Sequence, residues 1–363
     1  MKHPVAVIGA GNGGTAISAH LAGLGVDVNL CDLFPQYLEA ILAAGGIELT
    51  NEGATAHRVL HMVTADVPAA IAAARLILVV TPSFAHRMVA KAVAPALRDG
   101  HIVVLNPGRT GGALEFWNTV REEGCRADIT VAETQTLIYS CRRTGGAAVE
   151  IYGTKKEVDL GALPANRTQE VLDALHPYYP QFRPAKNCLQ TGLSNIGALF
   201  HPAPVLLNAG RIENDARGFL YYWDGITPSV AKLIHRIDLE RCAVAQAYCT
   251  PVVSAEEWLR RSYDTCGGDL YELIQHNDAY ADIRAPRSID ARYLTEDVPM
   301  SLVPLSELAR IAGVPVPNID AVITLAGTLF GRDFRAQGRS AARLGIEGMR
   351  RDRVVRYFET GEK

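Results

Sequence analysis

The stretch PVAVIGAGNGGTAISAHLAGLGVDVNLCD, residues 4–32, decides the fold of the first half of the chain. The apolar run at 4–8 predicts a buried strand, and GAGNGG at 9–14 follows it with the spacing G-x-G-x-x-G. Residues 15–25 predict a helix, and residues 26–32 predict a second strand that ends in an acidic residue. This order of elements predicts the first βαβ unit of a dinucleotide-binding domain.

Each part of this motif has a physical task. Gly9 permits the tight turn, Gly11 lets a pyrophosphate approach the backbone, and Gly14 lets the helix pack closely on the sheet. The helix N-terminus offers free N–H groups to the phosphates, and Asp32 is placed to accept hydrogen bonds from a ribose. The predicted cofactor site therefore consists of Gly9, Gly11, Asn12, Gly13, Gly14 and Asp32. Because Asp32 would repel a 2′-phosphate, we expect NAD(H) to be preferred over NADP(H).

The strand pattern continues beyond this motif. Apolar runs at 75–80, 101–105, 128–132 and 147–152 predict further strands of a doubly wound, mostly parallel sheet covered on both faces. Ligands of such sheets bind beyond the carboxyl ends of the strands, so the loops after these runs should line the nicotinamide end of the site. Glu133 and Thr134 lie in one of these loops, where they serve either as ligand contacts or as capping and turn residues.

Composition narrows the function classes. The chain has 363 residues, 48% of them hydrophobic, which favours two domains with a large core. A net charge of −3 without an extended basic stripe argues against nucleic acid as a partner. No apolar run approaches the ~18 residues of a membrane helix, and no signal peptide is evident. The seven cysteines form no CxxC pair, which disfavours disulfides and zinc; we expect a cytoplasmic protein without a metal.

The second half of the sequence is helical in pattern. Helices are predicted at 227–248, 253–263, 300–313 and 316–331, and Ser254 with Glu257 has the spacing of a capping box. We expect a Rossmann domain at 1–186 and an all-α domain at 187–363, with substrate bound in the cleft between them. The apolar C-terminal helices serve either the core or a homodimer interface.

One apolar segment of this half, SNIGALFHPAPVLLNAGRIE at 194–213, contains an unexpected histidine. Taken alone, His201 is more typical of a core histidine whose nitrogens are satisfied. Pro202 disfavours α geometry at His201, which predicts a helix break there, and Asn208 is expected on the same helix face.

A second polar island, RYLTEDVP at 292–299, contributes Arg292, Glu296 and Asp297. A histidine can donate the proton that hydride transfer to C=O or C=N requires, a carboxylate can orient it, and an arginine can bind a substrate carboxylate. Together these residue types suit the reduction of a 2-oxo acid or of its imine.

The motifs GAGNGG, LFHPAPVLLN and RYLTEDVP, in this order over nearly the whole chain, resemble the opine dehydrogenase family. This family includes octopine dehydrogenase and N-(1-D-carboxyethyl)-L-norvaline dehydrogenase. The resemblance implies a Rossmann domain followed by a helical domain of the 6-phosphogluconate dehydrogenase type. It also implies that the enzyme joins an amino acid to a 2-oxo acid, often pyruvate, and reduces the imine with NAD(P)H.

The resemblance implies roles for particular residues. The family's catalytic histidine corresponds to His201, its aspartate partner to Asp297, and an arginine implicated in binding the substrate carboxylate to Arg292. Asp32 matches the members that prefer NADH. Asn208 and Arg143 are weaker candidates, for which a capping or surface role is an equal alternative.

Three other functions fit parts of the sequence. A plain 2-oxo acid or ketopantoate-type reductase would share this architecture but need no amine. A non-catalytic dinucleotide-binding protein would keep the glycine motif without the His, Asp and Arg set. An enzyme for acyl-CoA or sugar phosphates would need clustered basic residues, for which only His86 and Arg87 are candidates, and these are better interpreted as a solvated helix face.

Overall fold

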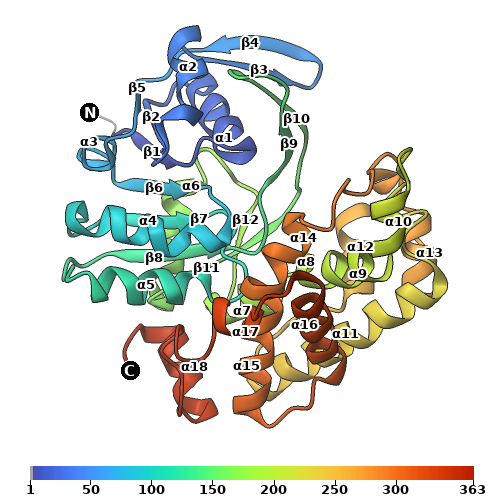
Figure 1. The fold of residues 1–363 in the computed structure, drawn as a ribbon. Coiled ribbons are helices and arrows are strands. Elements are labelled where there is room, and N and C mark those ends of the chain that lie inside the picture. Colours follow the sequence, from blue (N-terminus) through green and yellow to red (C-terminus); the bar gives the residue numbers. More distant parts are fainter. Residues whose placement is uncertain (1–2) are drawn as a thin grey trace. The chain divides into compact units, whose positions relative to one another are not determined.

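The computed structural model describes residues 3–363, which form two compact units (Figure 1). The first unit contains the chain up to Thr191 together with Arg356–Lys363, and the second contains Gly192–Val355. The chain therefore passes between the units twice. This division differs from the predicted ranges, 1–186 and 187–363, at residues 187–191 and at residues 356–363.

The first unit is built on an eight-stranded sheet in which all neighbours run parallel except β8 and β11. This arrangement confirms the predicted α/β fold with a mostly parallel sheet. The strand order is β12-β11-β8-β7-β6-β1-β2-β5. The strands are β1 (Val5–Ile8), β2 (Val28–Cys31), β5 (Met62–Thr64), β6 (Leu76–Val79), β7 (Ile102–Leu105), β8 (Thr130–Thr134), β11 (Val158–Leu163) and β12 (Phe182–Pro184).

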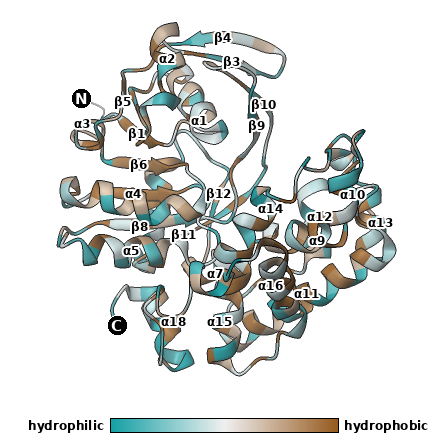
Figure 2. Ribbon diagram, in the orientation of Figure 1, coloured by the Kyte–Doolittle hydropathy of each residue, from teal (hydrophilic) through white to brown (hydrophobic). Residues whose placement is uncertain are grey.

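The central strands are apolar because both of their faces are covered. Every residue of β1, β2, β6 and β7 is buried, and β6 carries hydrophobic colour in Figure 2. The covering helices include α1 (Asn12–Gly23), α3 (Val67–Ile71), α4 (His86–Val93), α5 (Gly112–Glu122) and α6 (Thr168–Leu175). The carboxyl end of β1 leads directly into the glycine turn, so the sheet positions that turn.

A second, four-stranded sheet with the order β4-β3-β10-β9 packs against α1. Its strands are β3 (Ile47–Asn51), β4 (Ala54–Arg58), β9 (Tyr139–Arg143) and β10 (Ala148–Thr154), and the short helix α2 (Glu39–Ala44) precedes β3. We predicted the strand at 147–152 as part of the large parallel sheet, and this placement is wrong. It belongs to β10, which pairs parallel with β3 and antiparallel with β9. Only alternate residues of β10, Val149 and Ile151, are buried, as expected for a strand with one covered face.

The second unit is helical, as predicted. Its longest helix is α11 (Pro228–Ala247), which contacts several of the others. Ser254 accepts a hydrogen bond from the Glu257 N–H at 3.1 Å, which confirms the predicted cap. The remaining helices include α8 (Gly197–Phe200), α9 (Pro202–Leu207), α10 (Ala209–Asn214), α12 (Ala255–Tyr263), α13 (Leu270–Gln275), α14 (Arg292–Thr295), α15 (Val303–Ala312), α16 (Pro317–Phe330) and α17 (Phe334–Gln337), and a π-helical turn, η6, spans Val298–Leu302.

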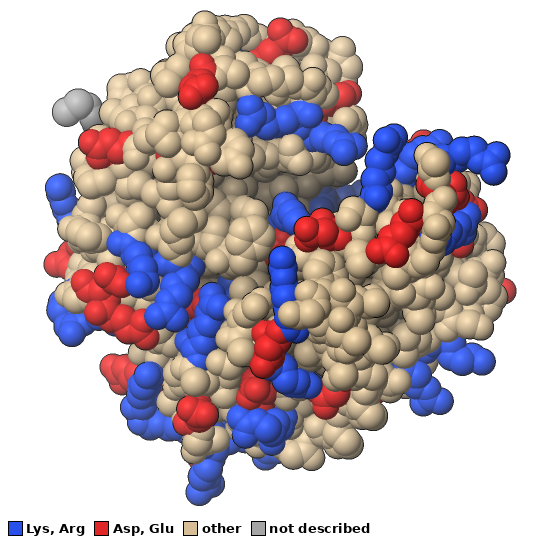
Figure 3. Space-filling view, in the orientation of Figure 1, with Lys and Arg blue, Asp and Glu red and all other residues tan. Residues whose placement is uncertain are grey.

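Acidic and basic side chains are interspersed over the face of the molecule in Figure 3, which agrees with the balanced charge of the sequence. Within residues 3–363, no helix combines the length and the apolar character needed to cross a lipid bilayer.

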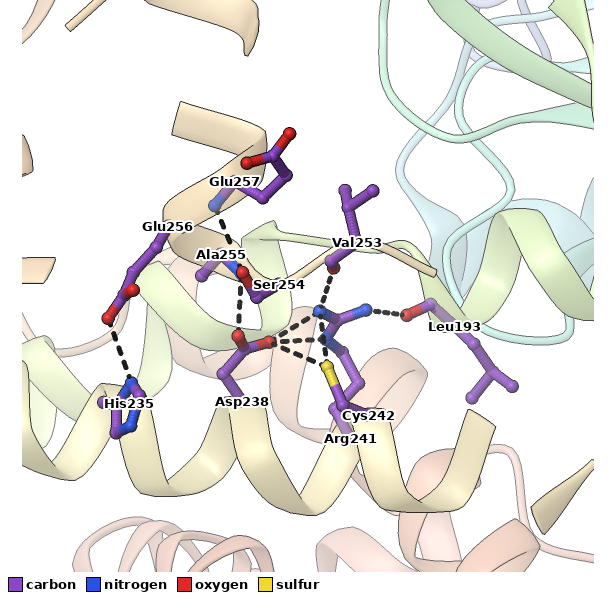
Figure 4. Close-up of polar contacts among 10 residues, drawn as sticks. All are labelled: Leu193, His235, Asp238, Arg241, Cys242, Val253, Ser254, Ala255, Glu256 and Glu257. Carbon is purple, nitrogen blue, oxygen red and sulfur yellow. Dashed lines mark hydrogen bonds and ion pairs between the residues drawn. The ribbon is translucent and has the colours of Figure 1, made fainter. Parts of the chain in front are cut away.

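A buried ion pair ties α11 to two neighbouring segments (Figure 4). Arg241 donates to Asp238 Oδ1 from Nε at 2.9 Å and from Nη2 at 2.6 Å, and both side chains are at most 4% exposed. Arg241 also donates to the carbonyl oxygens of Leu193 at 2.6 Å and Val253 at 2.7 Å, while Asp238 Oδ2 accepts the Ala255 N–H at 2.7 Å. Buried charges require such partners, so this cluster fixes the start of the second unit and the start of α12 against α11.

Candidate functional site

The glycine turn between β1 and α1 contains two kinds of glycine. Gly9 and Gly14 are required by the fold, whereas Gly11 faces open space. Gly9 has φ +112°, and a Cβ there would lie 2.5 Å from the Val80 carbonyl oxygen. A Cβ at Gly14 would lie 1.7 Å from the Gly9 carbonyl oxygen, so these two glycines permit the close packing of turn, helix and sheet. A Cβ at Gly11 would meet no atom within 4 Å. The open side of the turn at Gly11 is therefore the side on which a ligand can approach the backbone.

The start of α1 suits the phosphates of a dinucleotide. The helix begins at Asn12, and its N-cap residue is Gly11, which has no side chain to accept the first N–H groups, so these groups suit another acceptor. Asp32 lies at the end of β2, 9% exposed, and its carboxylate accepts the N–H of Ala10 at 2.7 Å and of Phe34 at 2.9 Å. The carboxylate is thereby held beside the glycine turn, where a ribose hydroxyl would need it. These features fit a bound NAD(P).

At two predicted cofactor residues, Asn12 and Gly13, the side-chain direction points toward the protein. Asn12 Oδ1 accepts the backbone N–H of Arg143 at 3.0 Å, a contact between residues 131 positions apart. A Cβ at Gly13 would lie 2.9 Å from Val80 Cγ1 and 3.0 Å from Leu137 Cδ2. At Asn12 and Gly13 it is therefore the backbone N–H groups that are suited to a cofactor. The sequence did not indicate the contact with Arg143.

Glu133 and Thr134 are the last residues of β8, not part of the loop in which we predicted them, and their contacts are structural. Glu133 is fully buried; Oε2 accepts the Ala113 N–H in the first turn of α5, and Oε1 accepts the Thr191 hydroxyl, each at 2.7 Å. The Thr134 hydroxyl donates to the Leu105 carbonyl oxygen at 3.3 Å. The Glu133 carboxylate thus caps α5, whereas the Thr134 hydroxyl joins β8 to β7.

The expectation of a solvated helix face at His86 and Arg87 is only half correct. Arg87 is half-buried, with its side chain 42% exposed, and forms an ion pair with Glu122 at 3.3 Å. His86 is fully buried, because it faces inward at the start of α4. The two residues therefore form no basic cluster on the surface.

In the second unit, His201 lies at the predicted helix break, between α8, which ends at Phe200, and α9, which begins at Pro202. The structure brings it to Asp297, with 2.8 Å between His201 Nδ1 and Asp297 Oδ2. Asp297 is 1% exposed and His201 is 20% exposed, so the carboxylate is buried behind a ring that reaches solvent. Within residues 3–363, Nδ1 is the ring nitrogen with a hydrogen-bond partner, which leaves Nε2 for a substrate.

Further side chains, which the sequence analysis did not select, position this pair. The Tyr293 ring stacks on the His201 ring with 4.2 Å between centroids and 10° between planes. The buried Tyr221 hydroxyl donates to the His201 carbonyl oxygen at 2.9 Å, and burial raises the pKa of Tyr221 well above its usual value, which keeps this donor protonated. Behind Asp297, Asn195 Nδ2 donates to Ser301 Oγ at 2.8 Å, and the Ser301 hydroxyl lies 3.4 Å from Asp297 Oδ1. Ser301 belongs to the π-helical turn η6, a geometry often found at functional sites.

The two remaining predicted site residues differ in their surroundings. Arg292 begins α14, is 59% exposed and contacts Oε2 of the buried Glu296 at 2.6 Å through Nε and Nη2, which orients the guanidinium. Asn208 Nδ2 donates to the carbonyl oxygens of Pro204 at 2.9 Å and Gly225 at 2.8 Å. Asn208 therefore has the capping role that we considered as its alternative, and its contact with substrate stays a prediction.

Comparison with known proteins gives a consistent result for both units. Residues 184–330 match the alpha-helical domain of NAD/NADP octopine/nopaline dehydrogenases, and residues 4–126 match the N-terminus of NAD-dependent glycerol-3-phosphate dehydrogenase. The opine dehydrogenase of Arthrobacter sp. (strain 1C) is 40% identical over 346 residues, which are 95% of each chain. A solved structure of octopine dehydrogenase with NADH and L-arginine has a TM-score of 0.82 at 26% identity, covering 100% of this chain and 99% of that one. The same coverage and identity hold for octopine dehydrogenase with NADH and pyruvate, with a TM-score of 0.81.

The matches thus extend over both the first unit, which contains the glycine turn, and the helical unit that carries His201 and Asp297. The identity to a curated relative extends over nearly the whole of both chains, so it is not confined to the common Rossmann fold. The chain therefore belongs to the opine dehydrogenase family and is an NAD(P)-dependent oxidoreductase of the class that acts on CH–NH bonds.

Proposed function

We propose that this enzyme condenses the amino group of an amino acid or simple amine with a 2-oxo acid, pyruvate first among them. It then reduces the imine to an N-(carboxyalkyl)amino acid, and it also catalyses the reverse reaction. The observation that carries the proposal is the His201–Asp297 pair, with 2.8 Å between Nδ1 and Oδ2. The octopine dehydrogenase complexes with L-arginine and with pyruvate support the two substrate classes.

The first unit holds the dinucleotide in this proposal. The backbone N–H groups at the start of α1 bind its phosphates, the open side at Gly11 admits the backbone contact, and Asp32 accepts the ribose hydroxyls. When bound, the reduced dinucleotide supplies the hydride for the C=N bond. Asp32 supports a preference for NADH, because a 2′-phosphate would repel its carboxylate.

His201 moves the protons. With Nδ1–H donating to Asp297, Nε2 is the nitrogen that exchanges a proton with the substrate. In condensation, the amine nitrogen attacks the 2-oxo carbon and forms a carbinolamine. Protonation of the carbinolamine hydroxyl by His201 lets water leave and produces the protonated imine, whose carbon is the electrophile. In the reverse reaction the same nitrogen accepts a proton from water as it adds to the imine. The stacked Tyr293 ring and the buried Asp297 carboxylate restrict rotation of the imidazole.

Arg292 binds a substrate carboxylate in this proposal. Its guanidinium is exposed and already oriented by Glu296, and the N–H groups that Glu296 does not use are available for an anion. Buried Glu296 thus acts as a positioning residue. A 2-oxo acid carries the carboxylate that this arrangement requires.

The test measures initial rates of NADH oxidation with pyruvate, with and without a panel of L-amino acids and simple amines. We expect an amine-dependent rate in the wild type and a fall of about 10²–10⁴-fold in kcat for His201→Asn, since general acid–base catalysis contributes this much. Asp297→Asn should also reduce kcat, because the amide no longer fixes the imidazole tautomer. The matched control is His235→Asn. His235 lies on α11 and pairs with Glu256, with 3.2 Å between His235 Nδ1 and Glu256 Oε1, so this variant also removes a histidine–carboxylate pair.

Two results would contradict the proposal. Equal turnover with pyruvate alone would assign a plain 2-oxo acid or ketopantoate-type reductase. Full activity of the His201 variant would return His201 to a structural role.

The proposal includes a cytoplasmic homodimer. The cytoplasmic location is supported by the seven cysteines, all of which are free thiols. The dimer is supported by exposed apolar side chains on α16, Leu325 at 54% and Leu329 at 51%. Sedimentation analysis of the purified protein tests the dimer.

A further inference from the structure

The cofactor turn is held from outside the Rossmann sheet by strand β9. The Arg143 backbone N–H donates to Asn12 Oδ1 at 3.0 Å, and its Nη1 donates to the Ala10 carbonyl oxygen at 2.8 Å. Its Nη2 donates to the Gly146 carbonyl oxygen. Two residues before it, on the same side of the strand, the Cys141 thiol lies 3.6 Å from the Asn12 carbonyl oxygen. One face of β9 therefore lies against the residues that begin α1.

The charge of Arg143 has no carboxylate partner in the part of the chain that the structure describes. The half-buried guanidinium of Arg143 donates to backbone carbonyl oxygens, among them that of Ala10. The nearby Asp32 carboxylate instead accepts the N–H of Ala10. Burial raises the pKa of Cys141 to about 11, so the adjacent thiol supplies no negative charge. Basic side chains gather over the region of α1, β9 and β10 in Figure 3.

The N-terminus of α1 adds a second positive group at the same place. The N-cap residue of this helix is Gly11, which has no side chain, and the positive end of the helix dipole lies at Asn12, whose side chain accepts the Arg143 N–H. A guanidinium and a helix start, side by side, are complementary to a phosphate group. The open space at Gly11 provides the approach.

We infer that Arg143 binds the pyrophosphate of the dinucleotide and holds the glycine turn in its binding conformation. This inference rests on the proposed cofactor site and extends it to a residue of the small sheet. We assign the pyrophosphate rather than a 2′-phosphate because Arg143 contacts Ala10 and Asn12, which belong to the turn where the pyrophosphate of a Rossmann site lies.

The experiment measures equilibrium binding of NADH, NADPH, ADP-ribose and adenosine to the purified protein by calorimetry and fluorescence, without substrates. Arg143→Gln should raise the Kd of NADH, NADPH and ADP-ribose by about tenfold or more, because a charge-assisted contact with an anion is lost. The Kd of adenosine should stay within about twofold. Arg143→Lys should recover part of the affinity, since it keeps the charge but not the planar fork.

The neighbouring Arg142 offers a matched control. It is exposed, lies on the opposite side of β9 and is paired in register with Glu150 of β10. Arg142→Gln removes the same charge from the adjacent residue and should leave the Kd of NADH within about twofold. The affinity of the wild type should also fall more steeply with salt than that of Arg143→Gln, because one fewer charge contacts phosphate in the variant.

Three results would overturn the inference. Unchanged NADH affinity in Arg143→Gln would exclude the contact. Loss of NADPH affinity alone would assign Arg143 to the 2′-phosphate. An equal loss of adenosine affinity would assign it a purely structural role in the turn. Failure of the wild type to bind NADH would instead refute the proposed cofactor, and this outcome is distinct from the other three.

Discussion

At the scale of the residue, Gly11 and Gly14 show how one motif combines folding and function. A Cβ at Gly14 would lie 1.7 Å from the Gly9 carbonyl oxygen, whereas a Cβ at Gly11 would meet no atom within 4 Å. Gly11 also has φ −76°, which any residue adopts. Gly14 is therefore needed by the fold, and Gly11 is needed only when a ligand approaches.

This difference predicts separate effects of the same substitution. Gly14→Ala should lower the free energy of unfolding by about 1–3 kcal/mol, because the turn must shift to relieve the overlap. Gly11→Ala should leave the free energy of unfolding within about 0.5 kcal/mol of wild type but raise the Kd of NADH severalfold, because the added methyl group occupies the approach of the pyrophosphate. Denaturant unfolding and NADH titration of both variants provide the measurements. Wild-type NADH affinity in Gly11→Ala would show that the cofactor does not approach this face.

At the scale of the element, α11 is held by charge as well as by apolar packing. Arg241 is 1% exposed, and its donors are used by Asp238 and by the carbonyl oxygens of Leu193 and Val253. Hydrophobic periodicity predicted the extent of this helix, but not this buried pair. The pair matters for the site, because it anchors Leu193, which is the second residue of the unit that carries His201.

We expect Arg241→Met to lower the free energy of unfolding by about 3–5 kcal/mol, since it leaves Asp238 buried without its counter-charge. The double variant Arg241→Met/Asp238→Leu should recover much of this loss, because no unpaired charge remains. Arg310→Met is the control; Arg310 pairs with Glu307 on α15 at the same i,i+3 spacing but is 62% exposed, so its loss should have little effect. Chemical denaturation measures all three variants. A double variant no more stable than the single one would show that the carbonyl contacts of Arg241, and not its charge, dominate.

At the scale of the whole molecule, the chain returns to its first unit at the C-terminus. The Tyr357 hydroxyl donates to Asn118 Oδ1, and Trp117 Nε1 donates to the Gly361 carbonyl oxygen at 3.1 Å. Asn187 Nδ2 lies 3.5 Å from Glu359 Oε1. The last residues of α18 (Arg351–Thr360) therefore complete the dinucleotide unit, although they follow the helical unit in sequence.

Removal of residues 356–363 should lower the thermal midpoint by several degrees, because Tyr357, which is 2% exposed, and its hydrogen bond are lost. The control is truncation after Gly361, which removes two exposed residues and keeps these contacts. Differential scanning calorimetry of the three proteins measures the effect. Equal midpoints for the full chain and the longer deletion would show that the C-terminal segment contributes nothing to the first unit.

Local sequence determined the parts of this protein that depend on near neighbours. The glycine turn, the buried strands of the large sheet, the helix at 227–248 and the break at His201 follow from residue type and spacing over a few positions. Motif resemblance added the roles expected of His201, Asp297 and Arg292, which binding and kinetic experiments now have to test.

Only the tertiary structure decided which distant segments meet. It brought His201 within 2.8 Å of Asp297, 96 positions away, placed Arg143 on the cofactor turn, and paired β10 with β3 in a separate sheet. It also returned residues 356–363 to the first unit. The physical reason is that such contacts depend on the path of the whole chain and on which surfaces are left to bury, and neither is encoded in the periodicity of a single segment.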